Sequence, residues 1–113
     1  MKMWVDRKKW SVESILLTPA ELAEKLEYIF NKIAHGYSPL PTTLTLPLSV
    51  LKAELEKEGI TADGEREFIC EIVEACNIAV RRFPQKFEFA PCHNPTYISY
   101  NVEIGFRYVV SKP

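Results

Sequence analysis

The segment 91–95, with the sequence PCHNP, carries the side chains best suited to chemistry in this 113-residue sequence. A thiol, an imidazole and a carboxamide, as in Cys92, His93 and Asn94, occur together in nucleophilic catalysis, where the imidazole activates the thiol. Neighbours on an extended loop point apart, however, and the only other imidazole is that of His35. We therefore expect a proline-bounded hairpin turn whose polar tip contacts a ligand or partner, and we place catalysis below binding.

Two further groups of side chains are expected to contact a ligand or partner. Arg81 and Arg82 come at the end of a predicted helix and are the expected anion contacts. Tyr97, Asn101 and Arg107 alternate with apolar residues near the end of the chain, which places them on the polar face of a predicted strand.

The sequence does not predict a metal site or a cofactor. Cys70 and Cys76 lie six residues apart on a predicted helix, and we expect both thiols to be buried as small apolar groups. The Cys-x-x-Cys and His-x-x-x-His pairs of zinc sites do not occur. The four glycines are isolated, so the glycine-rich loops that bind phosphates are missing too.

The longest periodic pattern runs from Thr96 to Val110, where apolar and polar residues alternate. This alternation predicts a strand with one apolar face, formed by Ile98, Tyr100, Val102, Ile104, Phe106, Tyr108 and Val110. At roughly 3.3 Å per residue such a strand would be about 50 Å long. A domain of this size is only about 35 Å wide, so the segment must bend, break or reach a second chain.

Other patterns predict the elements that position these residues. Thr18 and Glu21 form a capping box for a helix over 19–35, and a second long amphipathic helix ends at Phe83. We also expect one or two strands in the first 17 residues, strands over 42–46 and 86–90, a short helix over 49–58 and a loop over 60–64. The order predicts a single α+β domain over 1–113, with an antiparallel β-sheet covered on one face by two main helices.

Composition limits the setting of the protein. The net charge of −1 gives no bulk attraction to nucleic acid. Three cysteines, an N-terminal segment without a secretory apolar core and no long apolar run predict a cytoplasmic protein that does not enter membranes.

The segment 42–83 resembles a ribbon-helix-helix DNA-binding unit. It contains a strand with the sequence TTLTLP, a short helix, a turn with the sequence GIT and a longer helix. The resemblance implies paired strands from two chains that enter the DNA major groove. The strand over 42–46 carries no basic residue, and we transfer no residue roles from that family.

These observations predict a non-catalytic binding module, in preference to an enzyme. The module is expected to form a homo-oligomer. It would contact a protein partner or small ligand through the 91–95 loop and the polar sheet face. The first alternative is the DNA-binding regulator just described. The second is a small hydrolase or nuclease that uses Cys92 or His93.

Overall fold

The computed structural model describes residues 3–7, 15–63, 68–92 and 103–110 of the chain. Three helices lie in this part: α1 (Pro19–Ala34), α2 (Leu48–Lys57) and α3 (Phe68–Arg82). The strands are β1 (Met3–Asp6), β2 (Ile15–Leu17), β3 (Thr43–Pro47), β4 (Ile60–Asp63), β5 (Phe87–Cys92) and β6 (Glu103–Val109). The predicted α+β class is confirmed.

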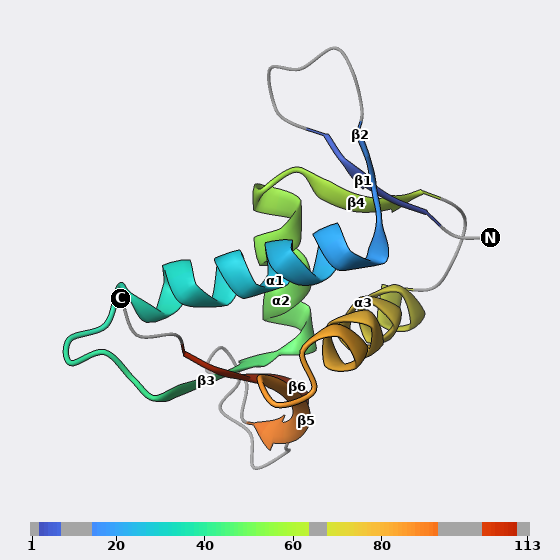
Figure 1. Cartoon of the computed structure of the whole chain (residues 1–113). Helices are drawn as coiled ribbons and strands as arrows, with labels where there is room; N and C mark the ends of the chain where they lie inside the picture. Colours follow the sequence, from blue (N-terminus) through green and yellow to red (C-terminus); the bar gives the residue numbers. More distant parts are fainter. Residues whose placement is uncertain (1–2, 8–14, 64–67, 93–102, 111–113) are drawn as a thin grey trace.

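The strands divide into two antiparallel sheets, where the sequence led us to expect one. The first sheet has the order β2-β1-β4 and the second has the order β3-β6-β5. The three helices lie between the two sheets in Figure 1, and α2 contacts β4 of the first sheet and both β3 and β6 of the second. One cluster of buried side chains joins both sheets to the helices.

Helix α1 begins where the sequence predicts. The Thr18 hydroxyl accepts a hydrogen bond from the Glu21 amide at 3.2 Å, and the Glu21 carboxylate accepts one from the Thr18 amide at 3.3 Å. These two bonds satisfy amides that the first helical turn leaves without partners. The apolar stripe of α1, which includes Leu22, Leu26 and Phe30, is buried against the core.

An aromatic cluster joins α1 to the second sheet. The ring centroid of Phe30 lies 5.9 Å from that of Phe87, 6.1 Å from that of Phe106 and 5.6 Å from that of Tyr108. Phe87 and Phe106 stack with their centroids 5.2 Å apart. The Tyr108 hydroxyl, at the edge of this cluster, accepts a hydrogen bond from Asn31 of α1 at 3.0 Å. The cluster therefore combines apolar burial with one satisfied polar group.

Strand β6 shows the predicted alternation, with one exception. Phe106, Tyr108 and Val110 are buried, whereas Ile104 on the same face is 62% exposed. Among the described residues, the helices cover the part of this face that holds Phe106, Tyr108 and Val110, and they leave Ile104 exposed. The predicted residues 96–102 of this segment lie outside the described residues.

In the described part of the chain, each outer strand of the second sheet has a proline near its end, on the edge that faces away from β6. The Val109 amide donates to the Lys86 carbonyl, and the Val110 amide donates to that of Thr42, each at 2.9 Å. Main-chain groups of successive residues point to opposite sides of a strand. Pro91 and Pro47 each lie five residues after one of these carbonyls, so the nitrogen of each proline faces away from β6. Each free edge thus lacks one N–H donor.

Residues 60–64 were predicted as a loop, and this prediction is wrong, because Ile60–Asp63 forms β4 beside β1. Gly59 permits the change of direction after α2, with φ of 79°, a conformation that residues with a Cβ rarely adopt. The chain therefore enters a strand directly after the turn, and a four-residue strand is too short to give a clear periodic pattern.

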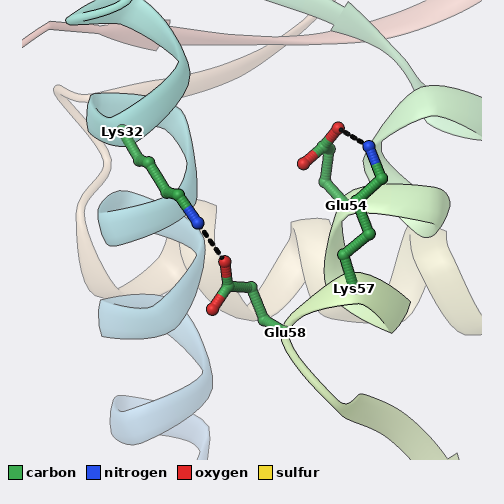
Figure 2. A network of polar contacts seen from close by, with 4 residues as sticks. All are labelled: Lys32, Glu54, Lys57 and Glu58. Atoms are coloured by element: carbon green, nitrogen blue, oxygen red, sulfur yellow. Dashed lines mark hydrogen bonds and ion pairs between the residues drawn. The ribbon is translucent and has the colours of Figure 1, made fainter.

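A surface ion pair joins the ends of two helices (Figure 2). Lys32 of α1 donates to Glu58, just after α2, at 2.7 Å, while Lys57 and Glu54 pair within the α2 region at 3.1 Å. The hydrogen bond to Glu58 raises the pKa of Lys32. Because Lys32 is exposed, we assign this pair a minor part in stability.

The described part of the chain measures 38 × 33 × 28 Å along its principal axes. None of the helices in that part is long and apolar enough to cross a membrane.

Replacing Phe30 by alanine should lower the free energy of unfolding by about 3–5 kcal/mol, because it removes the ring that contacts three others. Tyr28→Ala is the control, since Tyr28 lies on the same helix but is exposed, and it should change stability by about 0.5 kcal/mol or less. Urea unfolding followed by circular dichroism measures both. Equal losses would contradict the central place of Phe30.

Candidate functional site

The predicted loop over 91–95 begins later than expected. Pro91 and Cys92 belong to β5, where they pair with Ile104 and Glu103 of β6. His93, Asn94, Tyr97 and Asn101 lie outside the described residues, so their predicted contacts stay predictions.

Cys92 lies close to Gly105 on the outer face of the second sheet. A Cβ added at Gly105 would collide with the Cys92 Sγ and would lie 2.9 Å from the Ala90 carbonyl oxygen and 3.1 Å from that of Leu46. Only glycine fits between β3 and β5 here. Burial raises the pKa of the Cys92 thiol, and the nearby Glu103 carboxylate raises it further. Both effects oppose formation of the thiolate, which is the nucleophilic form.

The arginines that the sequence singled out lie in separate places. Arg107 of β6 pairs with Glu88 of β5 across the outer face of the second sheet. Arg81 and Arg82 are exposed at the end of α3 and line a hollow of about 370 Å³ together with Pro19 at the start of α1. The structure does not bring these two groups to a common site with Cys92.

Among the hollows lined by described residues, a strongly apolar one lies between α3 and the end of the second sheet that holds Pro91 and Ile104. It has a volume of about 510 Å³, and Val73 of α3, Phe89 and Pro91 of β5, and Ile104 of β6 line it. Glu103 supplies the one charged side chain among its described lining residues. We call this hollow the apolar groove. It begins beside Cys92, at the point where the predicted 91–95 loop leaves the sheet.

The groove was missed in the sequence because it depends on where α3 stops covering the sheet. Phe87, Phe89 and Pro91 alternate on one face of β5, and their partners in β6 are Tyr108, Phe106 and Ile104. Phe87 is buried, but Phe89 and Pro91 are exposed beyond the helices. The alternation predicts the face, but it does not show how much of that face is covered.

The two helical cysteines differ from each other. Cys76 is buried, as expected, and burial raises the pKa of its thiol far above the usual range. Cys70 is exposed, so its predicted burial is wrong. Six residues correspond to about 600° around an α-helix, which leaves the two thiols about 120° apart and only one of them on the core side. Among the described residues, no group of three or more histidine, cysteine, aspartate or glutamate side chains could hold a metal ion.

Two buried polar groups on β1 were not singled out in the sequence. Trp4 and Asp6 are each 5% exposed and lie on the same face of the strand. Asp6 Oδ2 lies 3.7 Å from Lys25 Nζ, while Asp6 Oδ1 and the Trp4 indole N–H have no partner among the described residues. The sequence did not indicate that these two side chains are buried. Their burial results from the pairing of β1 with β2 and β4.

Comparisons with known proteins add no relative: no family model, curated protein or solved structure matches this chain. Function must therefore be argued from the residues themselves.

The order of thiol labelling follows from exposure and pKa. With iodoacetamide at pH 7.5, Cys70 should react first, Cys92 more slowly and Cys76 only after unfolding. Because a neighbouring negative charge opposes deprotonation, Glu103→Gln should speed labelling of Cys92 and leave the rate at Cys70 unchanged. Peptide mass spectrometry measures the three rates separately. Fast labelling of Cys92 in the unmodified sequence would contradict the raised pKa.

Proposed function

We propose that the protein is a non-catalytic binding module whose apolar groove receives a small, mostly apolar ligand. The apolar side chain of a protein partner is the alternative occupant. The observation that carries the proposal is the hollow of about 510 Å³ beside the start of the 91–95 segment. The 91–95 loop and the polar sheet face, including Arg107, remain the proposed secondary contacts.

The size and chemistry of the groove support this proposal. Pockets that bind small molecules usually measure roughly 300–1,000 Å³ and have mainly apolar walls with a few polar groups. The groove has this character, with Glu103 as its charged member. Ile104 and Phe89 also expose more apolar surface than their strand pattern predicts, and exposed apolar clusters often mark binding surfaces.

The state of Cys92 favours binding over hydrolysis. A nucleophilic cysteine needs a lowered pKa or an adjacent base, whereas burial and Glu103 raise the pKa of Cys92. The carboxylate next to the thiol therefore acts in the direction opposite to activation. The hydrolase alternative would depend on His93, which lies outside the described residues.

The DNA-binding alternative has less support than the groove. In the segment 42–83, β3 pairs with β6 of its own chain, and β4 separates α2 from α3. A ribbon-helix-helix unit instead pairs this strand with a second chain and joins its helices by a turn. The DNA-binding regulator thus stays a prediction.

A cytoplasmic location, which the composition predicts, is also part of the proposal.

The groove can be tested with Nile red, an uncharged apolar dye. Ile104→Gln should reduce the dye fluorescence of the folded protein several-fold, because Ile104 is 62% exposed and lines the groove. Val109→Gln is the matched control, since Val109 lies on the same strand, is 47% exposed and lies outside the groove lining. Thermal unfolding verifies that both variants fold. Equal fluorescence from the two variants would remove the groove as a binding site.

A homo-oligomer is a separate part of the proposal. The prolines at both edges of the second sheet oppose main-chain pairing there, so we expect contact through exposed apolar side chains. Size-exclusion chromatography with light scattering should give a dimer or larger species at high protein concentration. A monomer throughout would end this part of the proposal and leave the groove untouched.

A further inference from the structure

The hollow beside Arg81 and Arg82 lies where the end of α3 meets the start of α1. Its volume is about 370 Å³, and its described lining residues are Pro19, Ile78, Arg81 and Arg82. The two arginines come three and four residues after Ile78, so the three side chains form one patch on α3. Ile78 is 8% exposed, whereas both arginines are exposed. The hollow therefore combines an apolar wall with two accessible guanidinium groups, and we call it the arginine hollow.

The two arginines differ from most basic side chains of the described part, because they have no acidic partner there. The basic side chains that do pair with a carboxylate are Lys25, Lys32, Lys52, Lys57, Lys86 and Arg107. The described lining of the arginine hollow contains no acidic residue. Glu21, two residues after Pro19, accepts instead from the Thr18 amide at 3.3 Å. Both positive charges at the hollow are thus available to a ligand.

The charge and donor geometry of the hollow favour a phosphate group. Each guanidinium offers planar pairs of N–H donors that match the oxygens of a phosphate. A phosphate monoester is close to a dianion at neutral pH, so it balances both arginines. Side chains on a helix lean toward its N-terminus, which directs both arginines back over Ile78 and away from the last carbonyl groups of α3.

The size and walls of the hollow favour a small organic ester. Its volume of about 370 Å³ lies within the range of roughly 300–1,000 Å³ that is usual for small-molecule pockets. Inorganic phosphate would leave much of this space, and the apolar wall formed by Ile78 and Pro19, without a contact. An organic group attached to the phosphate would cover that wall.

We propose that the arginine hollow binds a small organic phosphate monoester. The phosphate oxygens accept hydrogen bonds from Arg81 and Arg82, and the organic group covers Ile78 and the Pro19 ring. Val73, which lines the apolar groove, precedes Ile78 by five residues, or about 140° around α3. The two hollows therefore lie on different sides of that helix, and this site is independent of the function proposed for the groove.

Isothermal titration calorimetry of the full chain with phenyl phosphate at low salt tests the proposal. We expect saturable binding that is several-fold tighter than that of inorganic phosphate, because only the ester carries a group that covers the apolar wall. Absence of saturable binding would overturn the proposal. Equal affinity for the two ligands would also overturn it, since charge alone would then explain binding. A single-stranded DNA oligomer that binds more tightly than phenyl phosphate would show that the ligand class is wrong.

Variants locate the site. Arg81→Gln and Arg82→Gln should each weaken phenyl phosphate binding about tenfold or more, because each removes charge-assisted hydrogen bonds. Arg7→Gln is the matched control, since Arg7 is also exposed but follows β1, outside the lining of the hollow, and it should leave the affinity unchanged. Equal weakening in all three variants would overturn the proposal. Thermal unfolding verifies folding, and if Arg81→Gln or Arg82→Gln does not fold, the comparison of the two phosphates in the unmodified chain decides.

Discussion

The contact of Phe30 with the aromatic rings of β5 and β6 is the interaction on which the structure depends. It fixes α1 against the second sheet, and the other helices pack around α1. Phe87 and Tyr108 come within 4.8 Å of each other between their ring centroids, so the rings form one continuous apolar body. Burying each such ring contributes roughly 1.5–3 kcal/mol, which exceeds the contribution of the surface ion pairs around it.

Local signals in the sequence predicted most helices and the pairing of the last two strands. The capping box at Thr18 and the apolar stripe placed α1 to within a residue of its observed end, because both signals lie within one segment. Strand β4 was missed, since four residues after Gly59 contain too little periodicity. The division into two sheets could not be predicted either, because the pairing of β1 with β4 joins segments that are distant in sequence.

The sites were harder to predict than the elements, because they depend on what is left uncovered. The sequence singled out Cys92, and the apolar groove begins beside it. The described lining of the groove includes Phe89 and Ile104 but not Cys92 itself. The isolated Gly105 carried no signal of its own, although the close approach of Cys92 and two carbonyl groups requires it. The hollow of about 150 Å³ beside Trp4 lies where β1, β4, α2 and α3 meet, and periodicity within one element cannot reveal such a junction.

The placement of Pro47 and Pro91 has a consequence for recognition at the second sheet. A strand that pairs with either edge would find one N–H donor missing, so recognition at this sheet would depend more on the shape and volume of apolar groups. Such recognition tolerates chemical variety among ligands of similar shape, and its strength would vary little with ionic strength.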